Sequence, residues 1–108
     1  MSRSEPSRRA RVTQHGVIAG DLESLAAGGW QFRYLEAYDG EPVSLTLPVR
    51  SESYVFPSFP AVFEGLLPEG PQLEALLRLH KIDRHDSFRL LLTVGRDVVG
   101  SLTVEEAT

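Results

Sequence analysis

The run Trp30-Gln31-Phe32-Arg33-Tyr34 carries the clearest structural signal in this 108-residue sequence. Aromatic side chains occupy every second position, and one polar residue lies between each pair. Successive side chains of a β-strand point to opposite faces, so this pattern places the three aromatics on one face and the polar pair on the other. The run therefore predicts a strand whose aromatic face is buried.

Further strands are predicted on both sides of this run. Residues 9–23 predict a hairpin, because the His15-Gly16 pair supplies a turn with a glycine that can take a positive φ. Residues 44–49 alternate apolar and polar side chains, which predicts a half-buried strand. Pro48 indicates that this strand ends there or lies at an edge of the sheet. Residues 98–104 alternate in the same way and predict the last strand, with a frayed end after it.

Two helices are predicted in the middle of the chain. Apolar residues between 59 and 67 recur at helical spacing. A second helix is expected to follow with Gly70 as its N-cap and Pro71 at its first position, where the missing N–H of proline costs nothing. A Glu74–Arg78 pair is expected on its solvent side. Its apolar stripe consists of Leu73, Leu76, Leu77 and Leu79.

A third helix is expected to begin at Asp83 as its N-cap, with Asp86 in the first turn and Gly95 as a left-handed C-terminal residue. The order of strands, then helices, then one strand predicts an α+β fold, an antiparallel sheet with about three short helices packed on one side. Residues 1–8 are polar and predict a disordered leader, and residues 9–105 predict a single domain.

Composition excludes several classes of site and partner. The chain has no cysteine, which excludes disulfides, thiolate nucleophiles and cysteine-based metal sites and favours a cytoplasmic protein. The net charge is −4. The first eleven residues carry four arginines and one glutamate, so the remainder carries seven basic and fourteen acidic residues. An acidic body is a poor partner for a phosphate backbone, and no apolar run is long enough for a membrane span. We therefore expect no direct nucleic-acid binding and no membrane segment.

No catalytic or metal motif stands out. His80 and His85 lie five residues apart without a His-Glu-x-x-His pattern, and Ser101 lies in a predicted strand outside any Gly-x-Ser-x-Gly elbow. Residues 84–86 and 95–97 are scrambled forms of kinase motifs, without a phosphate-binding loop or a strand lysine. We expect no enzymatic activity, no cofactor and no metal.

Two groups of residues are candidates for contact with a partner protein. Tyr54, Phe56 and Phe59 lie in a proline-flanked loop, and they either roof the core or form an exposed apolar patch of the kind that marks an interface. Arg96 and Asp97 lie in a tight polar turn, where they either satisfy backbone groups or face a partner.

Four segments in order resemble the N-terminal subdomain of HipA-type toxin kinases. Two of them are Phe63-Glu-Gly-Leu-Leu-Pro-Glu-Gly70 and Val94-Gly-Arg-Asp-Val-Val-Gly-Ser-Leu-Thr103. The others are Ser44-Leu-Thr-Leu-Pro-Val49 and Gly16-Val-Ile-Ala-Gly-Asp-Leu22. Together they extend the resemblance over roughly residues 9–104.

The resemblance implies a function without catalysis, because the catalytic lobes of such kinases would follow this subdomain. In tripartite toxin–antitoxin modules the subdomain is a separate protein, HipS, which accompanies the kinase HipT and the helix-turn-helix protein HipB. A HipS-like chain is expected to bind and neutralise a HipT-like kinase, with a HipB-like DNA-binding protein in the same complex. The alternative is the non-catalytic N-terminal subdomain of a full HipA-type kinase, with no activity of its own.

The resemblance also points to the loop Pro68-Glu-Gly-Pro71 and the helix after it as the contact with the kinase. The family leads us to expect a bulky aromatic shortly after Pro-Glu-Gly, and this chain has a proline there. If inhibition needs a plugging side chain, Phe63, Phe59 or Tyr54 would supply it. The predicted partner interface consists of Tyr54, Phe56, Phe59, Phe63, Pro68, Glu69, Gly70, Pro71, Gln72, Arg96 and Asp97.

Overall fold

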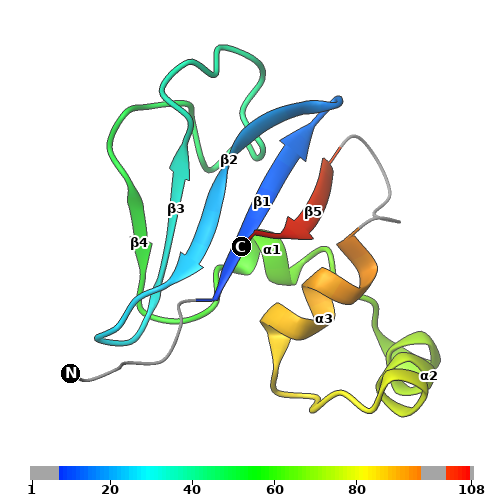
Figure 1. Cartoon of the computed structure of the whole chain (residues 1–108). Coiled ribbons are helices and arrows are strands. Elements are labelled where there is room, and N and C mark those ends of the chain that lie inside the picture. Colours follow the sequence, from blue (N-terminus) through cyan, green and yellow to red (C-terminus); the bar gives the residue numbers. More distant parts are fainter. Residues whose placement is uncertain (1–7, 96–101, 108) are drawn as a thin grey trace.

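A five-stranded antiparallel sheet with the strand order β4-β3-β2-β1-β5 forms the centre of the molecule (Figure 1). The structure is a computed structural model, and it describes residues 8–95 and 102–107. The strands are β1 (Arg9–Gln14), β2 (Val17–Ser24), β3 (Trp30–Tyr34), β4 (Tyr54–Phe56) and β5 (Leu102–Glu106). The helices are α1 (Ala61–Glu64), α2 (Gly70–His80) and α3 (Ser87–Val94). The predicted α+β fold is confirmed.

The predicted hairpin is formed by β1 and β2. Its turn is His15-Gly16, and both residues have positive φ, 51° and 80°. Two consecutive positive values are typical of the two-residue turns whose twist matches that of the flanking strands. A β-bulge between Val12 and Thr13 interrupts the register of the pair.

The alternation predicted for β3 is also confirmed. Phe32 and Tyr34 are buried and Arg33 is exposed. The Phe32 ring lies 5.6 Å from the Phe63 ring of α1, and Trp30 stacks on Phe88 of α3 at 5.2 Å. The aromatic face of β3 is therefore the face on which α1 and α3 pack.

The strand predicted at residues 44–49 is wrong. This segment forms a tight turn closed by a bridge between Ser44 and Leu47. The Ser44 hydroxyl accepts a hydrogen bond from the Thr46 amide at 3.2 Å, a local bond that competes with strand pairing. Leu45 at the tip is 96% exposed, whereas Leu47 is buried. The place beside β3 is taken instead by β4, a strand that the sequence pattern did not predict.

Hydrogen bonds through the Tyr34 hydroxyl hold this turn against the sheet. The hydroxyl accepts from the Val43 amide at 3.0 Å and donates to the Leu47 carbonyl. All three residues are buried. A buried backbone group without a partner costs about 1–3 kcal/mol, so this one side chain satisfies two groups that the turn would otherwise leave unpaired.

The predicted helix boundaries need corrections at their N-termini. The first helix is only the single turn α1, and α2 has Glu69, one residue before the predicted Gly70, as its N-cap. Asp86 caps α3 by accepting from the Arg89 amide at 3.1 Å. Asp83, the predicted cap, instead accepts from the His85 amide in the turn before the helix.

Three further expectations differ from the structure. Gly95 ends α3 in a right-handed conformation, and a Cβ there would lie 2.1 Å from the Val104 carbonyl oxygen. Close approach to β5 therefore explains this glycine. Strand β5 continues to Glu106, which pairs with Ala10 where fraying was predicted. Glu74 forms its ion pair with Arg84 at 2.7 Å, not with Arg78.

Arg8, which the sequence pattern assigned to the polar leader, contacts α3. Its guanidinium lies 2.6 Å from Asp86 Oδ1 and 4.8 Å from the centre of the Phe88 ring. Its backbone also exchanges hydrogen bonds with Ser24 at the end of β2. The residue thereby links the start of β1 to the first turn of α3.

Replacing Tyr34 with phenylalanine should destabilise the domain by about 1–3 kcal/mol, because the Val43 amide and the Leu47 carbonyl would stay buried without a partner. Urea denaturation of both proteins measures the difference. The matched control is Tyr54→Phe, whose hydroxyl donates to the Pro48 carbonyl in an exposed setting. An equal loss in both variants would contradict the role assigned to Tyr34.

The same tyrosine predicts how stability depends on alkaline pH. Burial raises the pKa of Tyr34, so the folded protein holds the phenolic proton to higher pH than the unfolded chain does. This contribution to stability is complete below the unfolded pKa of about 10, and it is lost as pH rises from there through the folded pKa. Urea midpoints measured from pH 9 upward should fall less steeply for Tyr34→Phe than for the wild type.

Candidate functional site

A groove lies between α1, the start of α2 and the start of α3. Its volume is about 470 Å³. We call it the α1–α2 groove. It is lined by Ala61, Glu64, Gly65, Leu67, Pro68, Glu69, Leu73, Arg84, Ser87 and Leu90. Its walls thus include two residues of the predicted interface, Pro68 and Glu69, together with apolar side chains of all three helices or their connections.

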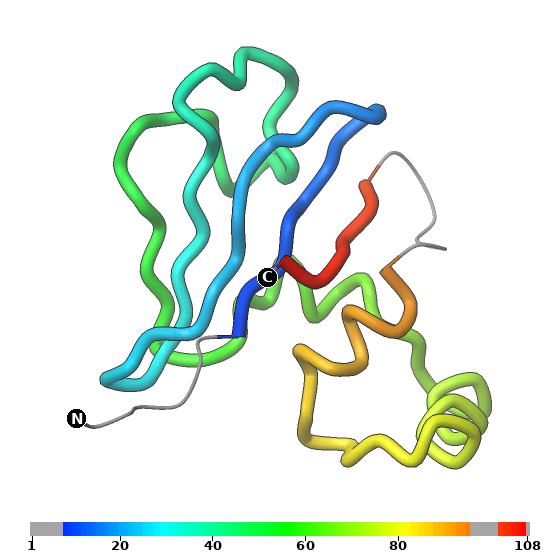
Figure 2. The backbone as a smooth tube through the Cα atoms, in the orientation of Figure 1, coloured from blue at the N-terminus to red at the C-terminus, as the bar shows by residue number. Residues whose placement is uncertain are grey.

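Helix α2 forms the outer wall of this groove and protrudes from the rest of the molecule (Figure 2). Pro71 is the second residue of the helix, one position later than the sequence predicts, and Lys81 ends it in a left-handed conformation with its amide bonded to the Leu77 carbonyl. None of its eleven residues is buried, and Leu79 is 77% exposed. An isolated helix of this length is only marginally stable in water, so α2 depends on packing contacts. Its own domain covers this amphipathic helix only in part.

The charged groups at the rim of the groove are mainly acidic. Glu64 and Glu69 are exposed. Arg84 is neutralised by its ion pair with Glu74. The side chain of Glu69 makes no capping bond to the first turn of α2. Glu69 and the neighbouring exposed Gln72 can therefore turn toward a bound partner without breaking a cap.

A local hydrogen bond stabilises the charged form of Asp83 in the loop before α3. The His85 amide donates to Asp83 Oδ1 at 2.8 Å, and this bond lowers the pKa of the Asp83 carboxyl. Because the group is exposed, water screens it strongly. The loop that carries Arg84 into the groove is thus shaped by an Asx-type turn.

The aromatic part of the predicted interface lies elsewhere. Tyr54 and Phe56 lie on β4, at the edge of the sheet away from α2 (Figure 1). Both are half-buried and pack against the core, and the Arg50 guanidinium covers the Tyr54 ring at 3.7 Å. Phe59 meets Trp30 edge to face at 5.1 Å. Of the two interpretations left open, these aromatics roof the core.

Phe63 is fully buried against Phe32, so it belongs to the core and does not project into the groove. The predicted interface therefore divides into aromatics that are buried or half-buried against the core and the segment 68–72, which is exposed except for the half-buried Pro68. Arg96 and Asp97 lie outside the described residues.

Sequence reasoning missed several residues that line the groove. Leu73 was predicted only as part of an apolar stripe, and its helical spacing was the available signal. Arg84 and Ser87 reach the groove because the loop after α2 folds back beside α1. The position of these two residues depends on tertiary structure, and no local pattern in the sequence predicts it.

The described part of the chain contains neither a metal-binding cluster nor a membrane-spanning helix. Residues 8–95 and 102–107 contain no group of three His, Asp or Glu side chains that could hold a metal ion. In the same residues no helix is both long enough and apolar enough to cross a membrane.

A family model and a solved structure point to the same family. The sequence matches the family model of the HipA N-terminal domain over residues 10–105. An uncharacterised protein of Haemophilus influenzae is 34% identical over 100 residues, which cover 92% of each chain. A solved structure described as the N-terminal domain of HipA toxin matches with a TM-score of 0.76 and 30% identity, over 99% of this chain and 98% of that one. The chain belongs to the HipA N-terminal domain family.

Proposed function

We propose that this chain is a HipS-like antitoxin subunit that binds and neutralises a HipT-like serine/threonine kinase by protein–protein contact. The observation that carries the proposal is α2, an amphipathic helix without a buried residue beside a groove of about 470 Å³. Family membership supports it, because the partner of a HipA N-terminal domain would be a HipA-type kinase. The Haemophilus relative is matched over 92% of its own length, so that protein consists of little beyond this domain.

The physical reason for binding is the incomplete burial of α2. Leu73, Leu76 and Leu77 follow the i, i+3, i+4 spacing of one helix face, and each remains partly exposed. Fully burying one leucine side chain contributes about 1.5–3 kcal/mol, so a partner that completes their burial gains affinity from them. Recognition of an amphipathic helix through such anchors is a common mode of protein–protein contact.

Neutralisation would follow from where the segment 68–72 contacts the kinase. It would either block the catalytic cleft or hold the two lobes in an inactive arrangement. Phe63 is buried, so the inhibitory group would come from exposed residues of this segment or of α2. A HipB-like helix-turn-helix protein would supply the DNA contacts of a cytoplasmic complex, because the body of this chain is acidic.

The second candidate is the non-catalytic N-terminal subdomain of a full HipA-type kinase. The match over 98% of the N-terminal domain of HipA toxin favours it. In that case α2 and the groove would face the catalytic lobes of the same chain. A stop codon after Thr108 in the native transcript supports the antitoxin, and an open reading frame that continues into kinase lobes supports the second candidate.

The first measurement is affinity purification of the tagged protein from its native host, followed by mass spectrometry. A HipT-like kinase as the dominant partner is the expected result. Adding the purified protein to that kinase should then abolish autophosphorylation. If the kinase is present in the cells but is not recovered, or is recovered with full activity, the proposal fails.

The double substitution Glu69→Ala with Gln72→Ala should weaken the complex about tenfold, because Glu69 is exposed in the lining of the groove and Gln72 is exposed in the first turn of α2 next to it. Isothermal titration calorimetry against the purified kinase measures it. Glu52→Ala, an exposed carboxylate on the loop before β4, is the matched control and should bind normally. Unchanged affinity of the double variant would place the contact elsewhere.

Leu73→Ala tests the helix separately from the loop. In the free protein it should change the free energy of unfolding by less than about 1 kcal/mol, because Leu73 is only partly buried. In the complex it should weaken binding about tenfold. Leu79→Ala, on another side of α2, should do neither, whereas Leu91→Ala in the core should cost about 2–5 kcal/mol of stability.

A further inference from the structure

The end of the sheet at the β1–β2 turn carries an apolar depression of about 290 Å³. Three aliphatic side chains line it although they are partly in water: Val17 is 57% exposed, Ile18 39% and Leu35 38%. Large aliphatic side chains gathered at one exposed place are unusual, whereas single ones are ordinary. This cluster is therefore a candidate interaction surface.

The bulge in the hairpin accounts for the exposure of Val17 and Ile18 together. In a regular strand one of two successive side chains would point into the core. In β2 the pattern is shifted, so that Val17 and Ile18 are both exposed and Ala19 and Gly20 are both buried. The pairing moves from Thr13–Ile18 to Val12–Gly20, which leaves Ala19 unmatched. The fold thus holds both side chains on the outside.

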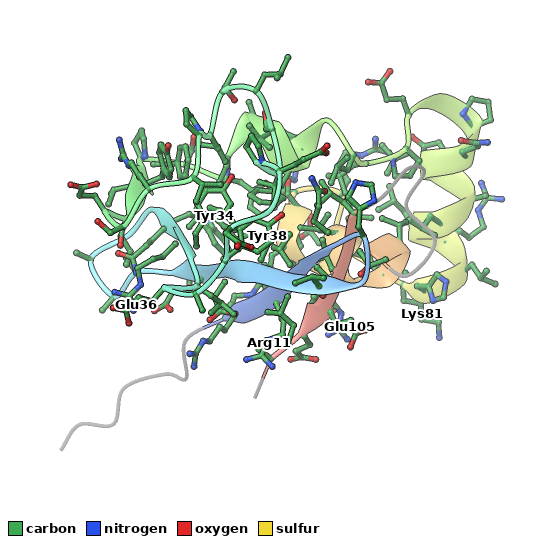
Figure 3. The ribbon with its side chains drawn as sticks, turned by 90° about the horizontal axis from the view of Figure 1, so that it is seen from above. Arg11, Tyr34, Glu36, Tyr38, Lys81 and Glu105 are labelled. Atoms are coloured by element: carbon green, nitrogen blue, oxygen red, sulfur yellow. The ribbon has the colours of Figure 1, made fainter. Side chains whose placement is uncertain are left out.

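The sheet face that the helices leave open is charged, which distinguishes it from the depression at the end of the sheet. Glu105, Arg11, Asp21 and Arg33 lie opposite one another across β5, β1, β2 and β3. Their signs alternate, and the Arg11 and Asp21 side chains approach to 3.7 Å. Figure 3 shows Arg11 and Glu105 on the neighbouring strands of this face. The charged row is largely neutralised within itself, which leaves the apolar end as the distinctive surface.

Two carboxylates border the depression. Glu41 faces His15 at 3.5 Å, and Asp39 forms no ion pair with any residue of the described ranges. Burial, Glu41 and Asp39, in that order, raise the pKa of the neighbouring Tyr38. The last two causes indicate a negative potential beside the apolar floor, which would attract a cation.

The walls of the depression are held in place before any partner arrives. The Tyr38 hydroxyl donates to the Glu41 carbonyl at 2.5 Å, and the Tyr38 ring stacks on Tyr34 at 5.7 Å (Figure 3). Gln14 Nε2 donates to the Pro42 carbonyl at 3.1 Å and ties the loop to β1. A preformed surface loses little conformational entropy when it binds.

We propose that this depression is a second protein-docking site, which takes a partner segment with an aliphatic side chain next to a lysine or arginine. The aliphatic group packs on Ile18 and Leu35, and the cation pairs with Asp39. The carboxylates repel a phosphate backbone, which argues against nucleic acid as the occupant. Figure 1 places the β1–β2 turn and α2 at opposite ends of the molecule, so the two sites can be filled at once. This site does not depend on the proposed kinase contact.

The test is an NMR titration of the ¹⁵N-labelled protein with a capped six-residue peptide that has two leucines between pairs of arginines. Amide shifts should change for residues 14–18 and 35–41. Two control peptides, one with serines for the leucines and one with glutamates for the arginines, should bind at least about fivefold more weakly. Equal binding of either control, or shifts centred on another surface, would overturn the proposal.

Three variants localise the site. Ile18→Ser removes part of the apolar floor, and Asp39→Asn removes the charge without changing the shape of the side chain. Each should weaken binding of the leucine–arginine peptide about fivefold, while urea midpoints stay close to the wild-type value because both positions are exposed. Leu79→Ser on α2 is the matched apolar control and should bind normally. Full binding by Ile18→Ser and Asp39→Asn would rule the site out, and so would self-association through this face in sedimentation experiments without peptide.

Discussion

Phe32 lies 5.6 Å from Phe63 and 4.9 Å from Tyr34, and all three rings are buried. Through these contacts one face of the sheet holds both α1 and the turn at residues 44–47. Aromatic side chains bury more area than any others and pack with defined geometry, so one strand can fix the position of several elements.

The α1–α2 groove lies at the margin of that ordered centre. Helix α1 is a single turn fixed by Phe63, whereas α2 follows a proline-rich connection and sends no side chain fully into the core. Its position depends on partly buried leucines and on the surface ion pair from Glu74 to Arg84. Exposed ion pairs of this kind contribute about 0–1 kcal/mol. This light attachment of α2 is the basis of the contact that we propose for it.

The sequence reveals those features whose signal is local. Alternation in Trp30–Tyr34 and the His15-Gly16 turn act through neighbouring residues, and both appear in the structure as predicted. Pro71 likewise marks a helix start, one position later in the helix than predicted. Residues 44–49 have an equally clear alternation, yet bonds from Ser44 and Tyr34 turn the chain there. The short β4 has no pattern long enough to detect. For the groove, the sequence predicted the segment 68–72 as a contact surface. The position of Arg84 in the groove wall depends on how the chain folds back after α2, which no local pattern predicts.

The pairing of β1 with β5 has a consequence for how the chain acquires its structure. Ala10 lies opposite Glu106, so the pairing at this edge of the sheet joins residues almost the whole length of the given sequence apart. Contacts of such long range slow folding, because loop-closure entropy is lost before they form. During synthesis β1 would leave the ribosome early and wait, with an unpaired edge, until β5 emerged. Completion of this sheet is therefore a late event in the synthesis of the domain, and the nascent chain would present an open strand edge until then.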